Sequence, residues 1–93
     1  MFDSDKAIES LEILFFFIEP LNLECNDSIR QFIYVGECKL ALDDIVVCYV
    51  DTNTKMPADL FQLVDELAIA MNLEKDPEYA GVTEFRKSYT KPT

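Results

Sequence analysis

One apolar stripe constrains the fold of this chain more than any other feature. Its members recur at the three- and four-residue intervals of a helix: Cys38, Ala41, Leu42, Ile45, Cys48 and Tyr49. At about 100° per residue they cover an arc of roughly 120° on a helix. Residues 45–50 are also rich in β-branched side chains, a composition typical of a strand. The unbroken spacing outweighs this composition and predicts a helix over residues 37–50.

Helical spacing also predicts a first helix over residues 5–18, capped by Ser4 and ended by Pro20. Most of its apolar side chains share one face. Three lie off that face and form either a second buried side or an exposed apolar patch: Ile13, Phe16 and Phe17.

Two further helices are predicted over residues 27–35 and 57–72. Gly36 suits the C-terminal cap of the first of these, and Pro57 suits the first position of the second. The predicted fold class is therefore all-α: a small four-helix bundle-like single domain spanning residues 1–93. Its C-terminal tail, residues 76–93, is expected to be less regular. Four side chains could pack this tail locally, or it could be mobile: Tyr79, Val82, Phe85 and Tyr89.

The charge of the chain is strongly unbalanced, with 18 acidic residues, 8 basic residues and a net charge of −10 at pH 7. Apolar residues make up 49% of the chain, so this is not a disordered acidic tail. A compact body of this charge repels nucleic acid and anionic membranes and attracts basic proteins. The charge therefore indicates a kind of partner, although it equally favours simple solubility.

The cysteines indicate a reducing compartment. Cys25, Cys38 and Cys48 have no C-x-x-C spacing, and the chain has no histidine, which argues against a zinc site and against a disulfide framework. We expect three reduced core thiols in a cytoplasmic protein. The acidic start is unlike a signal peptide, and the apolar run 13–18 is too short to span a membrane.

The usual devices of enzymes are missing from the sequence, since it has no histidine and only two glycines. Two adjacent acid pairs, Asp43–Asp44 and Asp65–Glu66, are the candidates for carboxylate chemistry. Adjacent helical residues point about 100° apart, so neither pair converges on one ion or one bond. We expect no catalytic activity, no metal and no cofactor. A carboxylate-based metal enzyme is the least favoured class of function.

The best functional signal is an acidic face on the predicted helix 37–50, opposite the apolar stripe. The acidic face consists of Leu40, Asp43, Asp44, Val47 and Asp51. Three acids interleaved with two aliphatic side chains can bind a basic partner around a small apolar centre. The acidic face is therefore either an interface, to which Glu66 of the next helix would contribute, or a second core contact with the first helix.

A longer pattern resembles a known family. Gly36, Glu37, Ala41 and Leu42 match a Gly-Glu-x-x-x-Ala-Leu segment, and the predicted last helix runs into a Met-x-Leu motif at residues 71–73. Over residues 29–73 the chain is similar to MafI-type immunity proteins and to immunity partners of contact-dependent growth inhibition toxins. The resemblance implies a helical cytosolic protein that binds and neutralises a cognate toxin domain. It implies no particular toxin contacts.

The favoured function is thus an immunity protein that occludes the active site of a basic toxin C-terminal domain, often a nuclease, as a 1:1 heterodimer. The charge argument is consistent with this, because a nuclease cleft is basic and an acidic inhibitor can mimic phosphates. The alternative is an acidic adaptor or regulatory module that binds another basic protein. No nucleic acid or membrane is expected as a partner.

Overall fold

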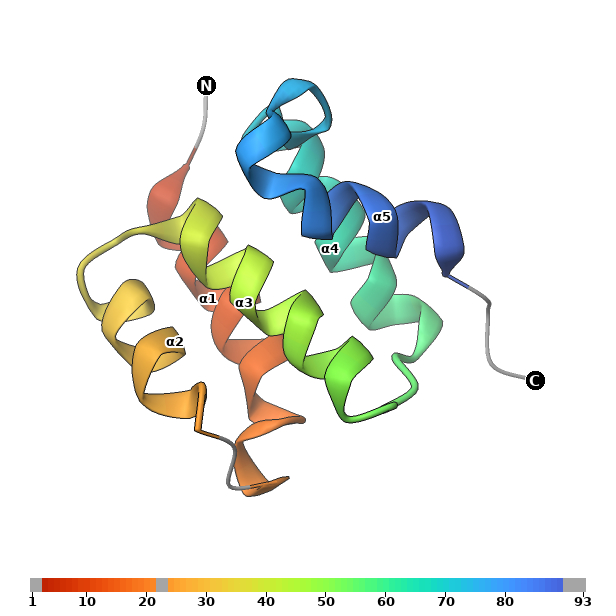
Figure 1. Cartoon of the computed structure of the whole chain (residues 1–93). Helices are drawn as coiled ribbons and strands as arrows, with labels where there is room; N and C mark the ends of the chain where they lie inside the picture. The colour runs from red at the N-terminus through yellow and green to blue at the C-terminus, as the bar shows by residue number, and fades with distance from the viewer. Residues whose placement is uncertain (1–2, 22–23, 90–93) are drawn as a thin grey trace.

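A computed structural model of the chain describes residues 3–21 and 24–89, and within these ranges it contains helices and no strand. Five α-helices pack around one core (Figure 1). Their bounds are α1 (Ser4–Phe16), α2 (Asn26–Tyr34), α3 (Cys38–Asp51), α4 (Ala58–Ala70) and α5 (Ala80–Ser88). The predicted all-α class is confirmed, and the strand-like residues 45–50 lie within α3.

Three helices end at a residue with left-handed backbone, which breaks the helix and turns the chain. Gly36 follows α2 with φ of 79°, Asn53 follows α3 with φ of 54°, and Asn72 follows α4 with φ of 59°. After α2 the N–H of Glu37 donates to the carbonyl of Phe32 over 2.8 Å, which satisfies an otherwise free helix-end acceptor. The predicted role of Gly36 as a helix cap is confirmed.

The helix starts and ends differ from the predicted ones in detail. Asp3 rather than Ser4 caps α1, because its carboxylate accepts the N–H of Lys6 over 3.2 Å. The α-helix ends at Phe16, and Pro20 lies in a separate 3₁₀ turn. Pro57 has extended backbone and stands immediately before α4 rather than at its first position.

Helix α3 occupies the centre of the molecule, between the α1–α2 pair and the α4–α5 pair (Figure 1). Its apolar stripe is buried, as the spacing predicts. The Tyr49 hydroxyl donates to the carbonyl of Leu14 over 2.9 Å and so ties α3 to the end of α1. The apolar side chains with no exposed surface come from all five helices and two turns: Leu11, Leu14, Ile18, Ile29, Ala41, Leu42, Ile45, Val46, Val64, Ala68, Leu73 and Val82.

The C-terminal segment is more regular than predicted. Residues 80–88 form α5, which packs against α3 and buries Val82 and Phe85 in the core. Tyr89 stacks on Phe61 of α4 with ring centroids 3.8 Å apart, and its hydroxyl donates to the Met56 carbonyl over 2.7 Å. These contacts hold a short helix whose own sequence is a poor helix former. The rest of the predicted tail, residues 90–93, lies outside the described residues.

Two of the three cysteines meet in the structure. Cys25, which precedes α2, has its sulfur in contact with the sulfur of Cys48 on α3, and their Cα atoms are 7.4 Å apart. Cys38 is free and buried, and burial raises the pKa of its thiol, with a further contribution from the neighbouring Glu37 carboxylate. The prediction of three reduced core thiols is therefore wrong for Cys25 and Cys48, which the structure joins. Their meeting depends on how α2 packs against α3, which spacing alone does not reveal.

Candidate interaction surfaces

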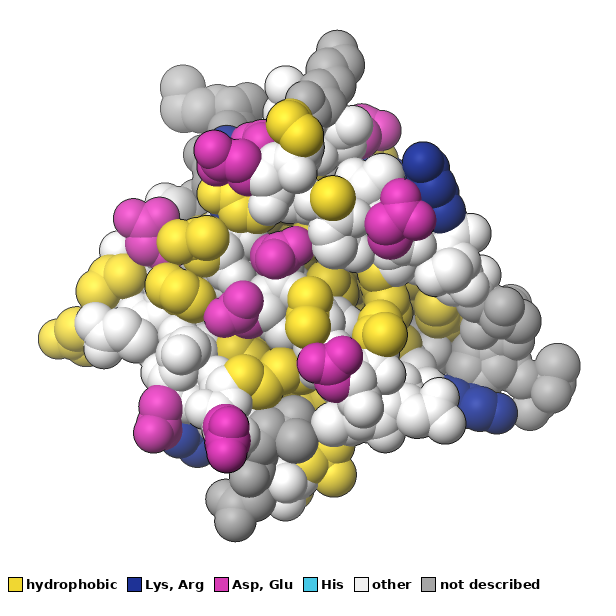
Figure 2. All heavy atoms as spheres, in the orientation of Figure 1, with side chains coloured by type: hydrophobic (Ala, Val, Ile, Leu, Met, Phe, Trp, Pro, Cys, Tyr) yellow, Lys and Arg dark blue, Asp and Glu magenta, His cyan; other side chains and the backbone are white. Residues whose placement is uncertain are grey.

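The acidic face lies along the outer side of α3, where its five members reach solvent to different degrees. Leu40 is 37% exposed and Val47 is 40% exposed. Asp51 is exposed at the C-terminal end of the helix, and Asp44 is half-buried. Figure 2 shows acidic and apolar side chains alternating over the middle of this side of the molecule, with Lys and Arg side chains near its edges.

Asp43 does not lie on an open surface as predicted, because α5 packs over it. Its Oδ1 atom is buried and has no hydrogen-bond partner among the described residues. A Cβ added to Gly81 would stand 2.8 Å from this oxygen and 3.4 Å from Cγ2 of Val47. Burial raises the pKa of Asp43, and the backbone N–H of Val82 opposes this by favouring the charged form.

The sequence left open whether this side of α3 is an interface or a contact with the first helix. The structure places a packing contact here, but with α5 instead of α1. One edge of the acidic face is therefore covered, and the exposed part consists of Leu40, Asp44, Val47 and Asp51.

Asp44 lies beside this covered edge, and its pKa is affected both by burial and by a neighbouring charge. Burial raises its pKa, and repulsion from the adjacent Asp43 carboxylate raises it further. Two carboxylates that disfavour each other's charge form a locally negative site. A positively charged side chain placed near Asp44 would relieve this repulsion.

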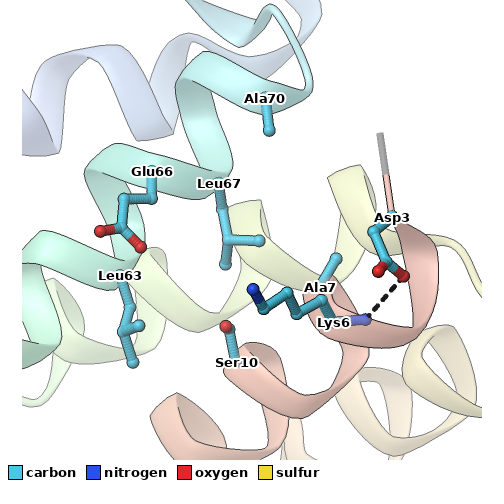
Figure 3. A pocket seen from close by; sticks show the side chains of 8 residues that line it. All are labelled: Asp3, Lys6, Ala7, Ser10, Leu63, Glu66, Leu67 and Ala70. Carbon is cyan, nitrogen blue, oxygen red and sulfur yellow. Dashed lines mark hydrogen bonds between the residues drawn. The ribbon is translucent and has the colours of Figure 1, made fainter. Parts of the chain in front are cut away.

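Glu66 lies apart from the acidic face, contrary to its predicted contribution. It lines a pocket of about 320 Å³ between α1 and α4, together with Asp3, Lys6 and Ser10 (Figure 3). Gln62 donates to the Glu66 carboxylate over 3.2 Å, one turn away on the same helix. The spacing within α4 could not reveal this, because the side that Glu66 occupies depends on how α4 packs against α1.

The candidate acid pairs do not converge. Asp65 pairs with Arg86 of α5 at 2.6 Å, whereas Glu66 faces the α1–α4 pocket. Within residues 3–21 and 24–89, no group of three metal-ligating side chains could hold a metal ion. None of the helices in that part of the chain has the length and apolar character needed to cross a bilayer.

Comparisons with protein families, curated proteins and solved structures gave no match. The resemblance to immunity proteins therefore stays a prediction that rests on the residues quoted for it.

A second exposed surface lies on α1, where the sequence left the status of Ile13, Phe16 and Phe17 open. All three are substantially exposed, so they form a surface patch and not a second buried side. The charge pattern of the sequence favours α3 as the interaction surface. The apolar side chains on α1 are nevertheless more exposed than Leu40 and Val47 on α3.

Proposed function

We propose that this chain is an immunity-type protein that binds a basic toxin domain, a nuclease, and blocks its active site as a 1:1 complex. The observation that carries the proposal is the exposed part of the acidic face. There Asp44 and Asp51 flank the exposed side chains of Leu40 and Val47, while the basic side chains of this side lie near its edges (Figure 2).

The physical reason for choosing a basic partner is charge complementarity. A nuclease cleft carries cationic side chains because it binds phosphates. A surface with carboxylates spaced along a helix can occupy such a cleft, and the net charge of −10 speeds the encounter. The same charge disfavours nucleic acid as the partner.

Each exposed member of the acidic face has a distinct part in the proposed interface. Leu40 and Val47 supply apolar surface that loses water on binding, and Asp44 and Asp51 supply the charge around it. Asp43 contributes less, because α5 packs over one of its carboxylate oxygens.

The test is co-expression with the product of the neighbouring open reading frame as the candidate toxin, with cell survival and binding affinity as readouts. Replacing Asp44 and Asp51 by Lys should abolish protection and weaken binding by about 2 kcal/mol or more. Glu24→Lys with Asp59→Lys is the matched control, since both side chains are exposed and neither lies on α3. The control variant should protect cells almost as well as the unchanged chain.

Circular dichroism must report an intact helical fold in both variants before survival is compared. Protection at the usual dose by a folded Asp44→Lys, Asp51→Lys variant would rule out the acidic face as the interface. Failure of the unchanged chain to bind the neighbouring toxin would rule out the immunity function itself.

A further inference from the structure

Helix α1 carries a strip of exposed apolar side chains bordered by carboxylates, which we name the α1 strip. It consists of Glu9, Glu12, Ile13, Phe16 and Phe17. Phe16 is 69% exposed and Phe17 is 50% exposed, and their rings meet edge to face with centroids 5.9 Å apart. Two phenylalanines that leave so much surface in water are not covered by any of the described residues, which is typical of an interaction site.

The α1 strip borders a groove of about 550 Å³ between α1 and α2, which we name the α1–α2 groove. Ile8, Phe15 and Phe16 line it from α1, and Ile33 and Tyr34 line it from α2. Tyr34 is 87% exposed, so its ring stands free at the border of the groove. Apolar side chains of both helices therefore line this groove, which is open to solvent.

The charge around the α1–α2 groove is negative. Arg30 is the one cation among the residues that line it. Its guanidinium donates to Glu19 over 2.8 Å and to Asp27 over 3.3 Å, and it lies 5.6 Å from the centre of the Phe15 ring. The Arg30 charge is thus already engaged, whereas Glu12 in the groove and Glu9 beside it form no ion pair among the described residues.

We propose that the α1 strip and the α1–α2 groove together bind a cationic amphipathic helix of a partner protein. Its apolar side chains would enter the groove beside Phe16 and Tyr34, and its lysines or arginines would face Glu9 and Glu12. A third helix fits the space between two packed helices, in the manner of other helix-in-groove complexes. The proposal is independent of the toxin and of the acidic face.

Charge decides against two other occupants. A second copy of this chain would bring its own Glu9 and Glu12 and a net charge of −10 against the same acids. A membrane with anionic lipids would repel the same carboxylates. A basic helix gains from both the exposed rings and the acids.

The probe is a synthetic peptide of about 14 residues, nearly four helical turns, composed of leucine and lysine at helical spacing. A second peptide of the same composition but alternating spacing, which cannot form an amphipathic helix, controls for charge. Binding to the full chain is followed by fluorescence anisotropy of the labelled peptide, and the site is mapped by amide chemical shifts.

Phe16→Ser should weaken binding of the helical peptide about tenfold, because it removes an exposed aromatic anchor. Ile69→Ser is the matched control, because Ile69 is 59% exposed on α4, and it should change affinity less than twofold. Glu9→Gln with Glu12→Gln should reduce the dependence of affinity on salt. This second variant keeps the apolar surface and tests the charge contribution separately.

The proposal is overturned if the helical and alternating peptides bind equally well, or if Phe16→Ser and Ile69→Ser have equal effects. It is also overturned if sedimentation shows a dimer of the unchanged chain that Phe16→Ser dissociates, since the occupant is then a second copy. Amide spectra of each variant establish that it is folded. Because the probe is a peptide, failure here leaves the toxin-rescue result unaffected.

Discussion

At the scale of single residues, Tyr49 shows how a polar atom can join two helices inside an apolar core. Leu14 lies in the last turn of α1, where backbone carbonyls have no helical partner. The Tyr49 hydroxyl supplies that partner from α3. Burial raises the pKa of Tyr49 to about 12, because the phenolate would lose its hydration.

Tyr49→Phe should lower the free energy of unfolding by about 0.5–1.5 kcal/mol, since it leaves the Leu14 carbonyl without its donor. Because the pKa is raised on folding, the Tyr49 contribution is complete below the unfolded value near 10 and is lost as pH rises towards 12. Urea unfolding from neutral to alkaline pH measures both effects. An equally steep alkaline loss of stability in Tyr49→Phe would contradict the assignment.

At the scale of elements, α5 packs closely on α3 beside the acidic face. Gly81 allows it, because a side chain at this position would meet Asp43. The result is a buried carboxylate oxygen without a partner, covered by a helix that would be unstable on its own.

Gly81→Ala should lower the free energy of unfolding by up to about 1 kcal/mol, because the Asp43 carboxylate must turn away from the new Cβ. In an Asp43→Ala background the same change should be neutral or stabilising by up to about 1 kcal/mol, because only the helix-propensity gain is left. Glu84→Ala, at an exposed position of α5, serves as the propensity control. Thermal unfolding of the double-mutant cycle measures the coupling, and equal costs of Gly81→Ala in both backgrounds would refute it.

Local periodicity is enough to predict α3, whereas α5 depends on tertiary contacts. The stripe from Cys38 to Tyr49 predicts α3 because its periodicity is local and unbroken, and tertiary packing only reinforces it. Helix α5 has no comparable stripe; Gly81 is a poor helix former, and Val82 and Phe85 become core residues only against α3. The sequence therefore could not predict α5, because this helix depends on its contacts with another helix.

For the candidate surfaces, too, the sequence predicts the faces of single helices but not the contacts between helices. The spacing correctly placed Leu40, Val47 and Asp51 on one exposed side of α3. It could not reveal that α5 covers Asp43, or that Glu66 turns towards α1. The helical periodicity of residue types predicts which residues share a face of a helix. Which neighbouring element covers that face is determined by the tertiary fold.

At the scale of the whole molecule, the negative charge opposes the compact state. Eighteen acids share a domain whose principal extents are 34, 27 and 23 Å, so their mutual repulsion acts over short distances. Few ion pairs offset it: Arg30 and Arg86 account for all the pairs among the described residues.

Salt should therefore have opposite effects on folding and on binding. Raising ionic strength from about 0.01 M to 1 M shortens the screening length from about 30 Å to 3 Å. The unfolding temperature should rise because self-repulsion is screened, while affinity for a basic partner should fall. Calorimetry and binding titrations in the same buffers measure both, and two changes of the same sign would contradict the charge argument.

The position of α5 has a consequence for how such a protein could acquire a new partner. The helix is only nine residues long, comes last among the described elements, and forms one border of the acidic face. Replacing the exposed side chains of α5 by others of different size or charge would change that border, while Val82 and Phe85 keep the helix packed on the core. Partner choice can thus be altered through the outer side of α5, without changing the residues that pack this helix on α3.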